Sequence, residues 1–284
     1  MAKSQRRRTT YKRNSKSQTS VIGRFFRRLV LLLFLGVFAS LVYQFRSGLA
    51  YYFNFKKHNR ADDEAKRISD VRNIQVLENH KGKALGIDVS EFQEKIDWDL
   101  VETIEENYPI DFVLIRATAG YDRLDRQFKR NWKGVKEKKF IRGAYHYYRP
   151  NENSIQQADF FIKHVRLEKG DLPPVLDIEK LPKTQSIDSL KVGLHRWLDR
   201  VEAHYKVRPI IYSGESYYDD FLKKEFSDYV FWIANYNFYR EKMDSDWLFW
   251  QFTEKASVTG IRRMVDVNVF NGDLQQLGFI TVEE

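Results

Sequence analysis

The 284-residue chain contains no cysteine, and this absence excludes three classes of protein. Without thiols there is no disulfide scaffold, no cysteine-ligated zinc and no cysteine nucleophile. Proline and glycine are scarce, at 6 and 14 residues, so the chain is neither collagen-like nor wholly disordered. The hydrophobic residues, 43% of the total, suffice for one full-sized core with an appendage, or for two small domains.

The sequence also lacks the common motifs of nucleotide and ester chemistry. It has no glycine-rich phosphate loop, no G-x-S-x-G nucleophile elbow and no Rossmann fingerprint. His146 and His164 suggest a metal site, but their spacing matches no zinc motif and no third ligand is evident. His146 lies within an apolar run, where a hydrogen-bonded barrel residue is the better interpretation. We therefore expect no metal and no organic cofactor.

Positive charge is concentrated in residues 1–28, which hold ten Lys or Arg and no acidic residue. Over the rest of the chain acidic and basic residues nearly balance, so the body lacks the basic surface of a nucleic-acid-binding protein. A basic arm alone could bind nucleic acid or stay solvated. This arm adjoins an apolar run, which favours a role in membrane topology. No nucleic-acid partner is expected.

The uncharged apolar run covers residues 29–45 and is at the short end of what spans the ~30 Å hydrocarbon core of a bilayer. The charge asymmetry around it predicts a cytoplasmic N-terminus. A cleaved signal peptide with a small-residue site at 48–50 is the alternative, but the basic region is long for that. We expect a single-pass anchor in the cytoplasmic membrane that contacts the lipid bilayer through residues 29–45. Residues 1–28 then form a cytoplasmic tail and residues 46–83 a partly helical juxtamembrane spacer, with the following domain in the periplasm or outside.

Eight apolar, β-rich runs follow this region, and stretches of this kind are typical of strands buried on both faces. Helical patterns fill the early gaps, with a capping-box pattern that starts at Ser154 and a longer helix that starts at Ser186. The last two gaps carry no clear helix. The sequence predicts an α/β fold, an irregular (β/α)₈-like barrel with few helices in its second half, preceded by one N-terminal transmembrane helix. The runs cover residues 85–89, 112–116, 140–148, 174–179, 209–213, 230–234, 247–252 and 264–270.

Acidic residues lie in three of these runs: Asp88, the pair Asp177 and Glu179, and Asp266. In a parallel barrel, polar residues at the carboxyl ends of strands form the site. Alternation sends Asp177 and Glu179 to one face, about 6.5–7 Å apart, where repulsion and burial keep one of them protonated near neutral pH. A protonated acid beside an ionised partner is what glycosidic cleavage needs. The alternative, that each acid caps a helix or pairs with a base such as Arg116, is harder to sustain for three strands together.

Aromatic residues cluster near the same strand ends. Tyr and Trp have apolar faces and polar tips, which suit the faces and hydroxyls of sugar rings. Ordinary core and rim packing is the alternative, and we expect it first of all for Tyr148 and Trp250. The candidates for substrate contact are Tyr145, Tyr147, Tyr212, Trp232 and Tyr236.

Residues 84–275 resemble glycoside hydrolase family 25, the lysozymes (N-acetylmuramidases) that cut peptidoglycan. The matching motifs occur in one order along the chain, which makes chance agreement implausible. They include GIDVSEFQ at 86–93, IDW at 96–98, FVLIRAT at 112–118, GAYHY at 143–147, PVLDIE at 174–179, WIANY at 232–236, WQ at 250–251 and VDVN at 265–268.

The resemblance implies an eight-stranded catalytic barrel, placed at residues 84–280, that hydrolyses the β-1,4 bond between N-acetylmuramic acid and N-acetylglucosamine in peptidoglycan glycan strands. By motif, Glu179 matches the family's general acid. Asp88, Asp177 and Asp266 match its other active-site acids, with Asp177 a candidate to orient the 2-acetamido group of the substrate.

Two further residues and one departure follow from the motifs. Gln251 and Asn268 join the residues expected to contact the substrate. The family usually has Glu after the Ala-Thr of the second strand, where this chain has Ala119. Because the missing acid is not one of the four above, we expect activity to survive with different substrate contacts there. The rival hypothesis is a non-catalytic peptidoglycan-binding module anchored in the membrane, although decay to a binding module usually removes an acid.

Overall fold

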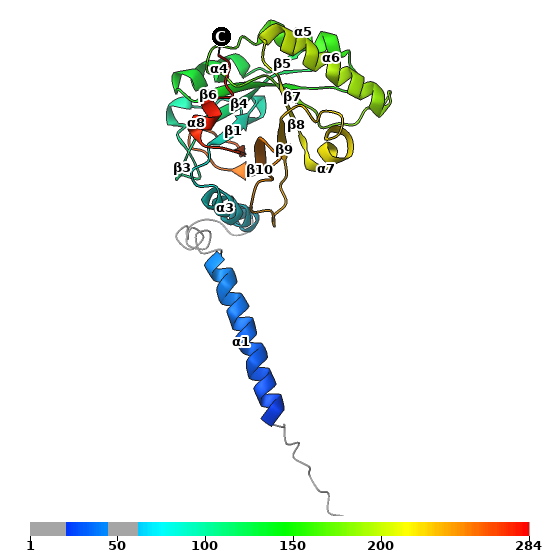
Figure 1. Cartoon of the computed structure of the whole chain (residues 1–284). Helices are drawn as coiled ribbons and strands as arrows, with labels where there is room; N and C mark the ends of the chain where they lie inside the picture. Colours follow the sequence, from blue (N-terminus) through cyan, green and yellow to red (C-terminus); the bar gives the residue numbers. More distant parts are fainter. Residues whose placement is uncertain (1–20, 45–61, 284) are drawn as a thin grey trace, which may run out of the picture. The chain divides into compact units, whose positions relative to one another are not determined.

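The structure, a computed structural model, describes residues 21–44 and 62–283 (Figure 1). The chain divides into two compact units, Met1–Arg46 and Ser47–Glu284. Residues 1–20 of the predicted basic tail and the candidate cleavage site at 48–50 lie outside the described residues.

The first unit contains helix α1 (Val21–Gln44). Its stretch Phe26–Tyr43 has a mean hydropathy of 1.9, and none of that stretch is buried within the protein. At 1.5 Å per residue, the 24 residues of α1 extend over about 36 Å, more than the ~30 Å of a bilayer core. The predicted apolar run is therefore helical, and it is long and apolar enough to cross a membrane.

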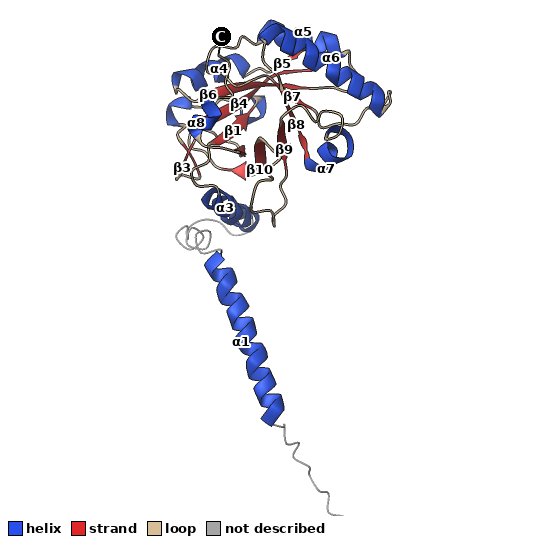
Figure 2. Ribbon diagram, in the orientation of Figure 1, coloured by secondary structure: helices blue, strands red, loops and turns tan. Residues whose placement is uncertain are grey.

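The second unit is a closed barrel of eight strands, as predicted (Figure 2). Strand β1 closes it by pairing with both β4 and β11. All eight predicted runs form strands, because each buries both of its faces. The barrel strands are β1 (Leu85–Val89), β4 (Phe112–Ala119), β6 (Ile141–Tyr147), β7 (Val175–Asp177), β8 (Ile210–Gly214), β9 (Phe231–Ala234), β10 (Phe249–Ala256) and β11 (Val265–Phe270).

Helices α4, α5 and α6 flank the first half of the barrel, as the sequence predicts, whereas α3, described below, packs on the second half. The short β5 (Arg123–Leu124) extends the sheet beside β4, while β2 (Thr103–Ile104) and β3 (Tyr108–Pro109) form a separate hairpin. The helices are α4 (Phe128–Glu137), α5 (Ser154–His164), α6 (Ile187–Tyr205), α7 (Glu215–Tyr217) and α8 (Leu274–Gly278), with short turns η1 (Glu91–Gln93), η2 (Trp98–Leu100) and η3 (Tyr218–Leu222).

Two helix starts test the capping predictions. Ser186 is the N-cap of α6, and its side chain accepts a hydrogen bond from the Ser189 amide, as predicted. The predicted cap at Ser154 is wrong by one residue, since the Asn153 side chain accepts from the Gln156 amide. Asn is at least as good an N-cap as Ser, so the neighbouring residue takes the position.

Strand β11 runs antiparallel to both of its neighbours, unlike the other barrel strands. The expectation of a parallel barrel is wrong at this strand. Only residues 257–264 join β10 to β11, and a parallel crossover needs a dozen or more residues. The start of β11, rather than its end, therefore lies at the rim formed by the carboxyl ends of the other strands.

Helix α3 (Asp62–Asn79) packs against β10 and shares the barrel's outer hydrophobic core. Its residues Ile74, Val76 and Leu77 are buried. The sequence placed this segment in the spacer at 46–83, so the predicted barrel boundary at residue 84 leaves out a helix that belongs to the same core. Buried polar residues such as Arg72 and Asn73 interrupt the apolar stripe by which such a helix is recognised.

The barrel interior below the rim is a packed core. Phe249 contacts Phe112 and Phe270 at ring-centroid distances of 5.3 and 5.1 Å. Residue 86 is glycine because a Cβ at this position would lie 2.4 Å from the Phe112 ring. Side-chain packing in the interior thus dictates the smallest residue in the first strand.

We predict that Gly86→Ala lowers the stability of the barrel by about 1–3 kcal/mol, because the added methyl group overpacks against a buried ring. Thermal unfolding followed by circular dichroism measures the effect. Gly278→Ala is the matched control, since a Cβ there meets no atom within 4 Å. Equal unfolding temperatures for the two variants would contradict the packing argument.

Candidate active site

A cavity of about 240 Å³ opens at the rim where the carboxyl ends of the parallel strands meet the start of β11. It collects residues that are far apart in the sequence, including all four predicted acids and all five predicted aromatic contacts. The predicted residues that line it are Asp88, Asp177, Glu179, Asp266, Tyr145, Tyr147, Tyr212, Trp232, Tyr236 and Gln251.

Asp88 and Asp266 form a hydrogen-bonded pair across the closure of the barrel. They stand directly opposite each other in the β1–β11 register. Burial raises the pKa of both carboxyls, and the negative charge of Asp88 raises the pKa of Asp266 further. Asp266 therefore retains the shared proton, and its hydroxyl donates to the carboxylate of Asp88.

Two amides complete the environment of Asp88. Gln251 Nε2 and Asn268 Nδ2 donate to its Oδ2 at 2.7 and 2.8 Å. These two hydrogen bonds stabilise the ionised form of Asp88. They offset part of the increase in its pKa that burial causes, and the pKa stays above its ordinary value. Trp232 Nε1 donates in turn to Asn268 Oδ1 at 2.7 Å, which fixes the orientation of that amide.

Asn268 is fully buried and does not line the cavity, in contrast to its predicted substrate contact. It shares a face of β11 with Asp266, but it lies two residues deeper in the barrel because this strand runs away from the rim. Its amide donates to Asp88 from the side that faces the barrel interior. This position suits a residue that orients Asp88 rather than one that contacts a ligand.

Asp177 ends β7, and Glu179 follows two residues later, on the same side of the chain. Ile178 between them points into the outer core, as the predicted alternation requires. Burial, and then the negative charges of Glu179 and Asp88, raise the pKa of Asp177 well above its ordinary value. Its Oδ1 has no hydrogen-bond partner within the described part of the chain. A buried carboxyl with an unpaired oxygen is suited to bind a polar group of a ligand.

Glu179 lies at the mouth of the cavity with its side chain exposed. The surrounding protein removes part of its hydration and raises its pKa, while Lys180 and Arg116 act in the opposite direction. Two neighbouring carboxyls therefore both hold protons more tightly than isolated ones do, and only Glu179 is open to solvent.

The aromatic residues of the cavity form two groups: Tyr145, Tyr212 and Trp232 are buried, whereas Tyr147 and Tyr236 are at least partly exposed. Tyr145 and Tyr212 pack on the buried Trp232 ring at centroid distances of 6.1 and 4.3 Å. Tyr212 and Tyr236 both donate hydroxyl hydrogen bonds to Gln251 Oε1, the former at 2.8 Å. Tyr236 and Tyr147 are open to solvent at least in part. By contrast, Tyr148 and Trp250 are buried in the outer core, as predicted.

Arg116 also lines the cavity, yet its hydrogen bonds go to acids outside the predicted set. Its Nε donates to Asp125 at 3.0 Å and its terminal nitrogen to Glu91 at 3.1 Å. The guanidinium lies 4.7 Å from the Phe92 ring centroid, and Phe92 lines the cavity too. The sequence reasoning missed Glu91 and Phe92, because pairing across 25 residues leaves no local signal. Arg116 thus does not neutralise the acids of the cavity by pairing with them.

His146 is a fully buried, hydrogen-bonded residue, as predicted. Its Nδ1 lies 2.7 Å from Thr118 Oγ1 and its Nε2 3.2 Å from Gln157 Oε1. Its ring stacks on Trp197 at a centroid distance of 5.4 Å, and burial lowers its pKa to about 3. Within residues 21–44 and 62–283, no group of three or more His, Asp or Glu side chains is arranged to hold a metal ion.

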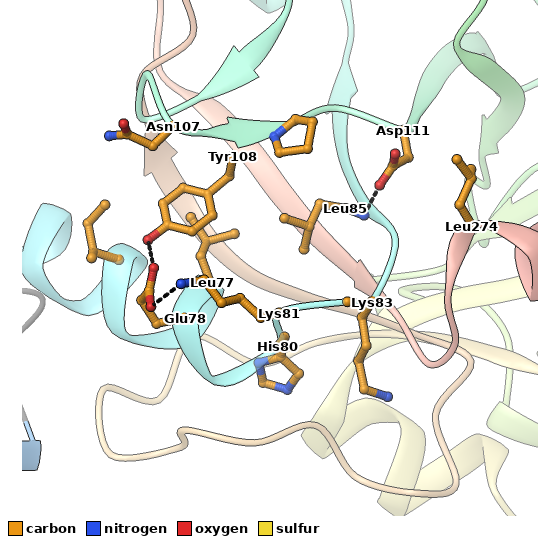
Figure 3. A pocket seen from close by; sticks show the side chains of 13 residues that line it. Leu77, Glu78, His80, Lys81, Lys83, Leu85, Asn107, Tyr108, Asp111 and Leu274 are labelled. Atoms are coloured by element: carbon orange, nitrogen blue, oxygen red, sulfur yellow. Dashed lines mark hydrogen bonds and ion pairs between the residues drawn. The ribbon is translucent and has the colours of Figure 1, made fainter.

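A larger hollow of about 710 Å³ lies at the other end of the barrel, near the starts of β1 and β4 (Figure 3). Its polar groups pair with one another: Tyr108 donates to Glu78 at 2.6 Å, and Lys81 pairs with Glu78 at 2.8 Å. Asp111 accepts from the Leu85 amide at 2.9 Å. In barrels of this kind, that end contributes to stability and the opposite end carries the chemistry. The smaller cavity is therefore the candidate active site.

Comparisons with known proteins identify the family of this barrel. The model of the family described as glycosyl hydrolases family 25 matches residues 87–261. The uncharacterised protein YegX of Escherichia coli K12 is 40% identical over 196 residues, which cover 68% of this chain and 71% of YegX. Lysozyme M1 of Streptomyces globisporus is 32% identical over 207 residues, or 68% of this chain and 69% of that lysozyme.

Among solved structures, the bacterial lysozyme from Streptomyces coelicolor superimposes with a TM-score of 0.63 and 28% identity. The superposition covers 71% of this chain and 98% of that lysozyme. The family match extends over more than half of the chain and contains three of the four acids, while the fourth, Asp266, faces Asp88 within the same barrel. The chain belongs to glycosyl hydrolase family 25.

Proposed function

We propose that this family 25 glycosidase hydrolyses the β-1,4 bond between N-acetylmuramic acid and N-acetylglucosamine in peptidoglycan. The observation that carries the proposal is the cavity with four carboxyl groups, two of them at adjacent positions of one face and two sharing a proton. Its aromatic walls suit sugar rings. The lysozymes among the relatives support the same substrate class.

Glu179 is proposed as the general acid. It stands at the mouth, where the oxygen of a leaving sugar is accessible, and its raised pKa favours the protonated form. A bound glycan displaces more water from this carboxyl and raises its pKa further. Glu179 then gives its proton to the glycosidic oxygen as the bond from the anomeric carbon breaks, and a water molecule completes the hydrolysis.

The other three acids act on the charge that develops at the anomeric carbon. Asp177, with its unpaired Oδ1, is placed to orient the 2-acetamido group or to stabilise that charge directly. The Asp88–Asp266 pair, held by Gln251 and Asn268, supplies one fixed negative charge beneath the ring. A fixed charge in a water-poor cavity stabilises a cationic transition state more strongly than it would in water.

We predict that Glu179→Gln keeps the fold and glycan binding but lowers the rate of hydrolysis about 10²–10⁴-fold, because an amide cannot donate the catalytic proton. The release of reducing ends from purified peptidoglycan measures the rate, and thermal unfolding checks the fold. Glu254→Gln is the matched control, since Glu254 also lines the cavity but is not one of the four acids. Normal turnover by Glu179→Gln would assign the acid role to another carboxyl, with Asp88 and Asp266 next to be tested.

The same experiment separates the enzyme from the rival function, a non-catalytic peptidoglycan-binding module. Such a module would bind purified peptidoglycan and release no reducing ends in the wild-type form. In that case Glu179→Gln would change nothing except binding.

We predict that Lys180→Met extends activity toward alkaline pH. The charge of Lys180 lowers the pKa of Glu179, so its removal keeps Glu179 protonated to a higher pH. Activity that requires the protonated acid falls as pH rises through this pKa, and the alkaline limb of the pH–rate profile should therefore move upward. Lys183→Met, which removes an exposed lysine three residues away, is the control. An unmoved alkaline limb would show that Glu179 does not govern it.

We further propose that α1 anchors the protein in the cytoplasmic membrane, with the N-terminus inside and the barrel in the periplasm or outside. The length and apolar composition of α1 and the charge asymmetry around it support this topology.

We predict that the full-length protein sediments with membranes and resists extraction by alkaline carbonate, and that added protease digests the barrel in intact spheroplasts. N-terminal sequencing of the protein in the membrane fraction shows whether the N-terminal segment has been cleaved off. A mature N-terminus near Tyr51 would establish a cleaved signal peptide, and a protected barrel would refute export.

A further inference from the structure

Helix α3 lies outside the family match at 87–261, yet one of its side chains reaches the strand and loop behind the active site. Arg72 is buried, with only 7% of its surface exposed. One terminal nitrogen donates to the carbonyl of Phe252 at 2.6 Å and the other to the carbonyl of Asn237 at 2.9 Å. Its guanidinium also lies 6.0 Å from the Trp250 ring centroid and 5.8 Å from that of Phe252.

The two carbonyls belong to residues that directly follow two residues of the cavity. Asn237 follows Tyr236, and Phe252 follows Gln251. Within the cavity the Tyr236 hydroxyl donates to Gln251 Oε1, and Gln251 Nε2 donates to Asp88. Arg72 therefore bridges, from the outer face of the barrel, the same two chain segments that meet on its inner face.

His80, just after the end of α3, contacts the same loop at a second point. Its Nε2 accepts a hydrogen bond from the Met243 amide at 3.3 Å, while its Nδ1 lies 2.7 Å from the carbonyl of Val76. These partners require the neutral tautomer with the proton on Nδ1, because an amide donates to Nε2 and a carbonyl accepts from Nδ1. The segment 235–243, which carries Tyr236, is thus held at Asn237 by α3 and at Met243 by the residue that follows α3.

The choice of arginine is informative. Burial of a guanidinium is costly, and an aliphatic side chain would fill an apolar position between α3 and β10 at lower cost. A guanidinium has several donors in a rigid plane, so it can bind two carbonyls of different segments at once. The geometry requires that property, and no aliphatic side chain provides it.

We propose that Arg72 is a positioning residue for hydrolysis: by joining the carbonyls of Asn237 and Phe252, it fixes the Tyr236–Gln251 pair that orients Asp88. This inference rests on the proposed hydrolase activity. It makes α3, a helix that precedes the family domain, a functional part of the catalytic unit.

The test compares Arg72→Met with Arg72→Lys and with Asn73→Leu in the full-length protein. Asn73 is the matched control, because it is also buried in α3 and its Nδ2 donates to Glu105 Oε1 and to the Lys255 carbonyl, away from the loop. The measurements are kcat and KM on purified peptidoglycan, the unfolding temperature, and amide hydrogen exchange in 235–243.

We expect Arg72→Met to lower kcat about 10-fold or more, since small displacements of positioning groups have effects of this order, and to speed exchange in 235–243. Asn73→Leu should lower the unfolding temperature but leave kcat within about twofold and exchange in the loop unchanged. Arg72→Lys, which keeps a donor and the charge, should recover part of kcat.

Equal losses of kcat in Arg72→Met and Asn73→Leu at equal stability would overturn the proposal, because they would show a merely structural role. If Arg72→Met does not fold, the same comparison is made between Arg72→Lys and Asn73→Leu. If the wild-type protein releases no reducing ends, the proposed function fails. Hydrogen exchange in 235–243 still tests whether Arg72 holds this loop, and unchanged exchange in the Arg72 variants would refute that role.

Discussion

The hydrogen bond between Asp266 and Asp88 depends on how the barrel closes. β1 joins β4 on one side and the antiparallel β11 on the other, and the register of that last pairing places the two carboxyls face to face. Only one of them ionises readily in such a pair, because two adjacent buried charges repel. The closure of the fold therefore also fixes where the protons of the cavity lie.

The rest of the cavity is organised around this pair. Gln251 and Asn268 hold the ionised partner, Trp232 holds Asn268, and Tyr212 and Tyr236 hold Gln251. Asp88, Gln251, Asn268 and Trp232 are all buried, so their polar atoms depend on one another for hydrogen bonds. In contrast, Asp177 and Glu179 lie beside this network and keep polar atoms available for a ligand.

The sequence was most informative where burial is uniform along a segment. Strands covered on both faces stand out as apolar runs, so the eight strands and the acids in them could be predicted. Strand direction has no such signature, and the antiparallel β11 was missed although its eight-residue connection excludes a long crossover. Asn268 was misplaced for the same reason. Helix α3 was assigned to the spacer because Arg72 and Asn73, buried polar residues, hide its apolar face, and their partners lie more than 30 residues away in the sequence.

The buried His146 makes the stability of the fold depend on pH. Its folded-state pKa of about 3 lies below the ordinary value of 6.5, so between these values the unfolded chain binds a proton that the folded chain excludes. This residue therefore lowers the free energy of unfolding by about 1.4 kcal/mol for each pH unit of acidification within that interval. The raised carboxyl pKa values act in the opposite sense, since those groups take up protons in the folded state first. Acidification therefore destabilises the outer core at His146 and stabilises the fold at the cavity carboxyls, so these two parts of the barrel respond to acid with opposite signs.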